Sequence, residues 1–266
     1  MTFVGAPSMD VVAIVGGSGF YCLEGLEDSS VVHVQSPYQP SPVKVHVGRL
    51  GLRPVLFLPR HGALHTVPPH KINYRANIDA LAQLGAQHVI GINAVGGMTS
   101  LMSPGSAVLA DQIIDYTWGR EHTFFDEFND ELAHIDFSAP LDSPYRKGAF
   151  THLAAKMNTL NSACYACVQG PRLESAAEVK KMQRDGCDIV GMTMMPEAAL
   201  AREKRMSYMS ICVVCNWAAG ISSSELNAVG EQQQSFAPLC VESMKAVLAE
   251  SLTKVQDAIV ETLTLV

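Results

Sequence analysis

The chain has 266 residues, of which 48% are hydrophobic and 17% are charged. This is the composition of a globular protein with a sizeable core, and it excludes an intrinsically disordered chain. The net charge of −7 argues against a nucleic-acid-binding protein, because such a surface needs clustered Lys and Arg.

Short apolar runs alternate with amphipathic segments along the chain. Strand-like runs lie at residues 10–15, 54–58, 88–92, 107–109, 163–168, 188–191 and 208–214, and helix-like segments at 73–84, 175–186, 196–204 and 238–263. This alternation predicts an α/β fold of one domain, with a largely parallel central β-sheet flanked by helices. Ligand sites in such folds lie at the carboxyl ends of the strands.

Two long stretches without charged residues, 81–110 and 206–224, raise the question of membrane spans. Polar and turn-forming residues such as Asn93, Pro104 and Asn216 interrupt them, so we expect buried strands and no membrane partner. The first basic residue is Lys44, so the basic start of a secretory signal peptide is missing. We therefore expect a cytoplasmic protein.

Seven cysteines include two C-x-x-C pairs, Cys164/Cys167 and Cys212/Cys215, a spacing also found in zinc sites. Both pairs fall in strand-like runs, where residues three apart point to opposite faces. Neither pair can then close on one ion, so we expect buried apolar cysteines with neither a metal nor a redox role.

Two loops that follow predicted strands suit an anion. Gly16-Gly17-Ser18-Gly19 offers backbone N–H groups and a hydroxyl, although a plain strand-to-helix turn has the same pattern. The loop matches neither the dinucleotide fingerprint nor a P-loop. Arg60 and His61 follow the run 54–58 and add further donors. Because no carboxylates accompany these groups to hold a metal, they predict direct binding of phosphate or a phosphate ester.

Seven motifs together resemble the trimeric purine nucleoside phosphorylases and methylthioadenosine phosphorylases, in order and approximate spacing. They are Gly16-Gly17-Ser18-Gly19, Arg60-His61-Gly62, Asn73-Tyr74-Arg75-Ala76-Asn77, Ala94-Val95-Gly96-Gly97, Gly170-Pro171-Arg172-Leu173-Glu174, Met192-Thr193 with Pro196-Glu197, and Asn216. The resemblance implies a homotrimer of nucleoside phosphorylase domains, each spanning residues 1–266. Such enzymes split the N-glycosidic bond of a purine nucleoside with inorganic phosphate as co-substrate, and need no cofactor or metal.

The resemblance also assigns roles to individual residues. Phosphate would be held by Ser18, Arg60, His61, the Ala94 backbone and Thr193, and the nucleoside by Leu173, Met192, Asn216, Trp217 and Ala218. Asn216 would face the purine N7 and the substituent at C6, and is the expected catalytic residue. Ser18 and Asn93 depart from the Thr usual in methylthioadenosine phosphorylases, and no role is assigned to Asn93.

Glu174 and Asn216 bear on the choice of base. Relatives that act on adenine nucleosides carry Ser and Asp at these positions, and those that act on hypoxanthine and guanine nucleosides carry Glu and Asn. A 6-oxopurine has an N1–H that a Glu174 carboxylate can accept, and an amide at position 216 can donate to N7 or O6. Two mismatches of about 1–3 kcal/mol each give discrimination of roughly two orders of magnitude. The alternative is a solvated Glu174 that caps the helix after Ser175.

The residues expected near the 5′ position of the sugar are a second indication of the substrate. Phosphorylases for inosine and guanosine usually place a His near the 5′-hydroxyl, after the position of Asn216, but all nine histidines here lie at or before His152. Leu226 and Val229 suit an apolar 5′-methylthio group, with Asn227 between them as a further specificity residue. We therefore expect phosphorolysis of S-methyl-5′-thioinosine in purine salvage. A methylthioadenosine phosphorylase, a broader inosine/guanosine phosphorylase, a hydrolase and a silent purine-binding protein remain alternatives.

Overall fold

The computed structural model describes residues 9–127, 134–221 and 241–264, and the structural statements below concern these residues. Asn227, Leu226 and Val229 lie outside them, so their predicted roles have no structural counterpart here.

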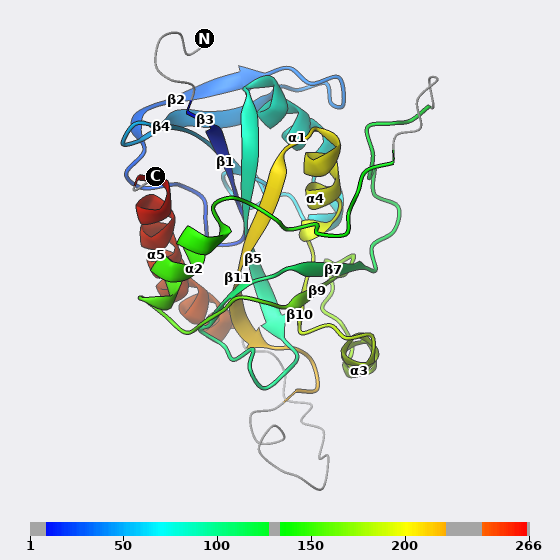
Figure 1. The fold of residues 1–266 in the computed structure, drawn as a ribbon. Coiled ribbons are helices and arrows are strands. Elements are labelled where there is room, and N and C mark those ends of the chain that lie inside the picture. The colour runs from blue at the N-terminus through cyan, green and yellow to red at the C-terminus, as the bar shows by residue number, and fades with distance from the viewer. Residues whose placement is uncertain (1–8, 128–133, 222–240, 265–266) are drawn as a thin grey trace, which may run out of the picture.

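The described residues form eleven strands joined in one sheet, together with five α-helices and a 3-10 turn (Figure 1). The strands are β1 Val11–Gly16, β2 Glu27–Val34, β3 Val43–Leu50, β4 Arg53–Pro59, β5 Ala86–Gly97, β6 Ala107–Leu109, β7 Gln112–Asp115, β8 Thr159–Leu160, β9 Cys164–Cys167, β10 Ile189–Gly191 and β11 Ser207–Trp217. The helices are α1 Tyr74–Gln83, α2 Arg146–Ala154, α3 Ala176–Arg184, α4 Met194–Glu203 and α5 Val241–Thr264, and the turn is η1 Pro69–Lys71.

The centre of the sheet is parallel, as the sequence predicts. Strands β4, β1, β5 and β11 run in the same direction, with β1 between β4 and β5 and with β11 on β5. Val12 and Ile14 of β1 face one apolar cluster, whereas Ala13 and Val15 face another. Burial on both faces explains the continuous apolar runs in the sequence. The predicted α/β fold with a largely parallel sheet is confirmed.

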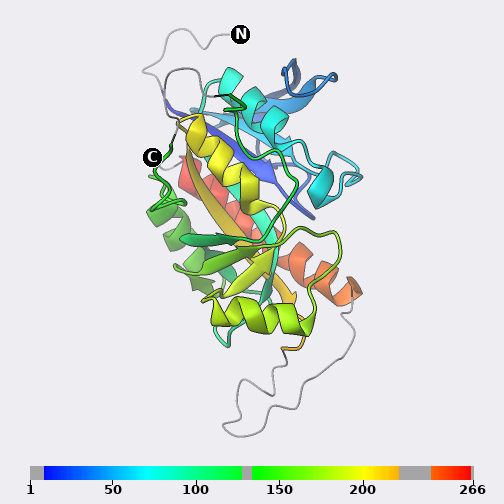
Figure 2. The same cartoon turned by 90° about the vertical axis from the view of Figure 1, so that its right-hand side faces the viewer.

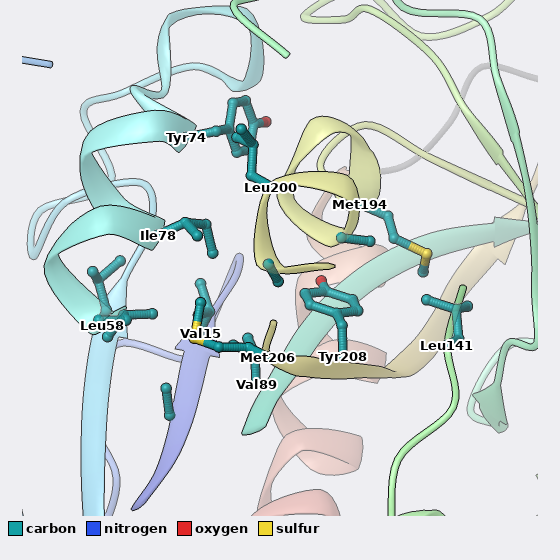
Figure 3. Packing of buried hydrophobic residues seen from close by; sticks show 14 of the residues in the cluster. Val15, Leu58, Tyr74, Ile78, Val89, Leu141, Met194, Leu200, Met206 and Tyr208 are labelled. Atoms are coloured by element: carbon teal, nitrogen blue, oxygen red, sulfur yellow. The ribbon is translucent and has the colours of Figure 1, made fainter. Parts of the chain in front are cut away.

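Helices cover both faces of this sheet. In the turned view of Figure 2, α1 and α4 lie in front of the sheet and α5 lies behind it. Figure 3 shows Ile78 of α1 and Leu200 of α4 in the cluster that contains Val15 and Tyr208 of the sheet. Helices α2 and α5 pack together over the opposite face. The sheet is therefore the middle of three layers.

Each predicted strand and helix is observed, but several observed elements are not predicted. Strand β2 has mostly exposed side chains and lacks a regular apolar alternation. Strand β3 is not predicted either, although Val43, Val45 and Val47 alternate along it, and neither are the short strands β7 and β8. Helix α2 was also missed; it buries only Ala149 and Leu153. No helix in the described part of the chain is both long and apolar enough to cross a membrane.

Candidate functional site

A cavity of about 240 Å³ lies beside the second half of β5, where β1, β4, β10 and β11 end. It brings together nine of the residues singled out from the sequence. They are Ser18, Arg60, His61, Ala94, Leu173, Glu174, Met192, Thr193 and Asn216. Residues far apart in the chain thus meet at the strand ends, where an α/β sheet offers its ligand site.

Trp217 and Ala218 do not line this cavity. Ala218 is 2% exposed and packs in a separate cluster with Met98 and Val190. Trp217 contributes its carbonyl oxygen, which accepts a hydrogen bond from Asn216 Nδ2 at 2.6 Å. Their predicted contact with a nucleoside stays a prediction.

A β-bulge turns Asn216 toward the cavity. Along β11, Val214 lies opposite Val95 and Asn216 opposite Gly96, so Cys215 has no partner on β5. Neighbouring strand residues normally point to opposite faces, yet Cys215 and Asn216 both line the cavity. The extra residue re-aims the strand end, as bulges commonly do beside functional sites.

Arg60 is anchored in the protein beneath the cavity. Its guanidinium forms two hydrogen bonds to Glu197, from Nε at 2.9 Å and from Nη2 at 2.8 Å. It also donates to the carbonyl oxygens of Ile92 and Val15. Burial alone would lower the pKa of Arg60, but the ion pair with Glu197 reverses this and raises it above its ordinary value. Four of the five N–H groups are used, so one on Nη1 has no partner among the described residues.

The glycine loop makes room for this arginine. A Cβ atom on Gly17 would lie 2.8 Å from Arg60 Nη1 and would also collide with the carbonyl oxygen of Ile92. Gly17 therefore lets the loop approach the arginine closely. Ser18 follows in the same loop and lines the cavity.

His61 is held in a single orientation. Its Nδ1 lies 2.8 Å from the carbonyl oxygen of Val67, so Nδ1 carries the proton and Nε2 is left for a ligand. Burial, with Arg60 and His65 nearby, lowers the pKa of His61 to about 4, although the bond to Val67 opposes the shift. His61 is therefore neutral at physiological pH.

Asn93 and Thr193 form a buried hydrogen-bond chain at the floor of the cavity. The Thr193 hydroxyl donates to Asn93 Oδ1 at 2.7 Å, and Asn93 Nδ2 donates to Ser210 Oγ at 2.7 Å. The chain joins β5, β11 and the residue before α4. Asn93, to which the sequence assigns no role, thus fixes the rotamer of Thr193.

Glu174 lies in the loop after β9, which β1, β5 and β10 separate from the strand β4 before Arg60, and it defines the other end of the cavity. It is 8% exposed, and no described side chain donates a hydrogen bond to its carboxylate. Burial raises the pKa of Glu174, with a smaller opposing effect from its own backbone N–H. The cap of α3 is instead formed by Ser175 and Glu178, so the alternative role of Glu174 as a solvated capping residue is wrong.

Two further residues shape the cavity without having been assigned a role. Arg120 connects the loop after β9 with the loop after β10, because it donates hydrogen bonds to the carbonyl oxygens of Gln169 at 2.8 Å and Met192 at 2.9 Å. Met244, near the start of α5, adds an apolar side chain to the wall. In the sequence, Met244 is marked by its place in the apolar stripe of the last helix, and Arg120 stands in the segment 115–122, which also carries the family resemblance, without an assigned role.

The donor set of the cavity suits an anion bound directly by protein groups. Glu174 is the one carboxylate that lines the described cavity, since Glu197 is already paired with Arg60 beneath it. No group of three or more Cys, His, Asp or Glu in the described ranges could hold a metal ion. At one end, the Ser18 hydroxyl and an arginine N–H can donate to an anion, and Nε2 of the neutral His61 can accept from a proton that the anion carries. With the amide of Asn216 and the carboxylate of Glu174 at the other end, these groups define a site for a protonated anion and a polar heterocycle.

Comparison with known proteins places the chain in a family. The model of the phosphorylase superfamily matches residues 11–253, so the chain belongs to that superfamily. A probable S-methyl-5′-thioinosine phosphorylase of Xylella fastidiosa is 46% identical over 222 residues, which are 83% of this chain and 93% of the relative. A 6-oxopurine nucleoside phosphorylase of Pyrococcus furiosus is also 46% identical, over 82% of this chain and 83% of its own.

A solved structure supports the same relationship. Methylthioadenosine phosphorylase from Schistosoma mansoni in complex with adenine superposes with a TM-score of 0.85 at 27% identity, and the match covers 96% of this chain and 91% of that one.

Proposed function

We propose that this protein is a purine nucleoside phosphorylase that cleaves S-methyl-5′-thioinosine. Inorganic phosphate is the co-substrate, and hypoxanthine and 5-methylthioribose 1-phosphate are the products, in purine salvage without a cofactor. The buried Glu174 carboxylate carries this proposal, because it lines the cavity without a donor from any described side chain. Relatives named for methylthioinosine and for 6-oxopurine nucleosides support it.

A 6-oxopurine gives Glu174 the donor that the protein does not supply. Its N1–H would donate to the carboxylate, which offsets the desolvation that raises the pKa of Glu174. Adenine presents a lone pair at N1 and would leave the buried carboxylate facing another acceptor. One Nδ2 hydrogen of Asn216 is used by Trp217, and the second is available to donate to the purine N7 or O6.

The reaction needs a stabilised leaving base and a placed phosphate. In our proposal Asn216 donates to the base as negative charge develops on it, and phosphate held by Ser18, Arg60, His61, the Ala94 backbone and Thr193 attacks C1′ from the other face. Positioning and electrostatics then supply the rate, with no covalent enzyme intermediate. Met192 and Met244 line the cavity and suit the sugar and its apolar 5′-methylthio group.

The test is a phosphate-dependent assay of methylthioinosine, methylthioadenosine and inosine with the purified protein. We expect kcat/KM to be highest for methylthioinosine, and the double variant Glu174→Ser/Asn216→Asp to move preference toward methylthioadenosine. One solved relative is a methylthioadenosine phosphorylase. A preference of the wild-type protein for methylthioadenosine would support the alternative that this protein has the same activity. Release of free sugar without phosphate would indicate a hydrolase, and binding without turnover a purine-binding protein.

We also propose that the working form is a homotrimer. The resemblance to trimeric purine nucleoside phosphorylases supports this, and Trp118, 72% exposed, and Phe125, 40% exposed, in the segment between β7 and α2, are the candidate interface residues. Size-exclusion chromatography with light scattering should give three times the mass of one chain. A fully active monomer would contradict the proposal.

A further inference from the structure

Two cysteines face each other at the beginnings of β9 and β10. Cys164 Sγ lies 4.0 Å from Cys187 Sγ, although the residues are 23 positions apart in the chain. Parallel pairing of the two strands, with Ile189 opposite Tyr165, brings them together. The C-x-x-C partner of Cys164 is not involved, since the Cys167 thiol contacts the carbonyl oxygen of Met195 at 3.7 Å.

The surroundings of the pair favour reaction. Cys164 is partly exposed, and its thiol donates to Cys187 Sγ. This hydrogen bond lowers the pKa of Cys187, and the Tyr116 hydroxyl 3.9 Å away adds to it, although burial and the negative charges of Asp185 and Asp188 act in the opposite direction. The thiolate is the reactive form of cysteine. Cys187 itself is buried, at 2% exposed, so the partly exposed Cys164 is the thiol that an oxidant meets first, with Cys187 beside it to complete a disulfide.

We propose that Cys164 and Cys187 are a redox-active pair that hydrogen peroxide converts into an intramolecular disulfide. Cys164 loses its proton, its thiolate attacks one peroxide oxygen, the O–O bond breaks, and a Cys164 sulfenic acid and hydroxide form. The Cys187 sulfur then displaces the sulfenic hydroxyl group, which leaves as water with the Cys187 proton. The hydroxide takes up the proton lost from Cys164. Two thiols are oxidised to one disulfide, and one peroxide is reduced to two water molecules.

The disulfide would link two neighbouring strands at the end away from the cavity. Strand β9 leads toward Glu174 and β10 leads into Met192 and Thr193, so the new bond joins the starts of the strands that carry these loops. Closing the intervening chain restricts the unfolded state. For a chain of this size we expect the melting temperature to rise by about 5 °C.

The experiment uses the full chain with Cys22→Ser, because Cys22 is exposed and could form bridges between molecules. The reduced protein is treated with hydrogen peroxide, quenched, alkylated and digested without reduction. Chymotryptic cleavage after Tyr165 separates Cys164 from Cys167. We expect a peptide that joins Cys164 to Cys187 and disappears on reduction, together with the rise in melting temperature.

Single Cys164→Ser and Cys187→Ser variants are the matched controls, and each should lose both the linked peptide and the peroxide-dependent rise in melting temperature. The proposal is overturned if peroxide gives only separate sulfenic or sulfinic acids, or if Cys187 is linked to Cys167. It is also overturned if the linked peptide forms without a change in melting temperature. The peptide analysis of the protein that retains both cysteines is decisive even where a variant fails to fold.

Discussion

The two ends of the cavity are built in opposite ways. At the end with Arg60, His61 and Thr193, each polar side chain already has a partner in the protein, through Glu197, Val67 and Asn93. At the end with Glu174, a carboxylate is buried without a donor from any described side chain. The first end is held in place before a ligand arrives, and the second depends on the ligand to complete its hydrogen bonds.

The two ends therefore have different tasks: the first positions the anion, and the second selects the purine. A preorganised set of donors and acceptors costs little reorganisation when an anion binds. An unpaired buried group instead penalises every ligand that fails to satisfy it. We therefore expect substitutions at the first end to affect stability and phosphate binding, and substitutions at the second to affect the choice of purine.

The largest effect is expected from Glu197→Gln, which leaves the buried Arg60 guanidinium without its full counter-charge. Breaking one partner of a buried ion pair costs about 3–5 kcal/mol, measured as the free energy of unfolding in urea. The matched control is Glu250→Gln in the exposed pair with Lys254, where the expected loss is below about 0.5 kcal/mol. Equal small losses in both variants would show that the anchoring of Arg60 is unimportant.

The next effect concerns the purine end. Glu174→Ala removes the acceptor for N1–H, so the ratio of kcat/KM for methylthioinosine to that for methylthioadenosine should fall by roughly 10- to 100-fold. Lys181→Ala, on the neighbouring helix α3, is the control and should leave the ratio unchanged. An unaltered ratio in the Glu174 variant would mean that this carboxylate does not select the base.

Asn93 tests the hydrogen-bond chain at the phosphate end. Asn93→Ala frees the Thr193 hydroxyl, and we expect KM for phosphate to rise roughly tenfold, equivalent to the loss of one buried hydrogen bond. Ser210→Ala, one bond farther along the chain, should give a smaller rise. If KM for the nucleoside rises instead of KM for phosphate, Asn93 acts at the other end of the cavity.

The smallest effect is a dependence of stability on pH. The pKa of His61 is lowered to about 4 in the folded protein, whereas an unfolded histidine titrates near 6.5. Below about pH 6.5 the unfolded chain therefore takes up a proton that the folded chain does not, and stability falls as pH decreases toward 4. Between pH 6.5 and 5.5 we expect a loss of about 1 kcal/mol from this group.

Urea denaturation across this pH range measures the loss. Between pH 6.5 and 5.5, the free energy of unfolding of His61→Asn should fall by about 1 kcal/mol less than that of the wild type. The control His33→Asn, at an exposed position, should follow the wild type. Identical profiles for the wild type and the His61 variant would contradict the assigned orientation and burial of His61.

The sequence predicts the central strands and nine cavity residues, because apolar runs and short motifs mark strand ends locally. It assigns no role to Asn93 or Arg120, and none to Glu197, although that residue stands in a recognised motif. Their roles depend on contacts across the fold: Asn93 bonds to a residue 100 positions away, and Arg60 meets Glu197 across 137 positions. No local spacing encodes such pairs. The proximity of Cys187 to Cys164 is not predicted for the same reason, since the two residues are 23 positions apart and Cys187 lies just before β10.

The unpaired Cys215 in β11 has a consequence for how this protein can change. Up to Val214 the register of β11 is fixed by its pairing with β5. Beyond Val214, the one extra residue, Cys215, determines which side chains face the cavity. Removing Cys215 would restore the regular alternation, so that adjacent residues at the strand tip no longer share the cavity wall. A one-residue deletion or insertion there offers evolution, or an engineer, a way to exchange the residue that faces the base while the fold of the sheet stays the same.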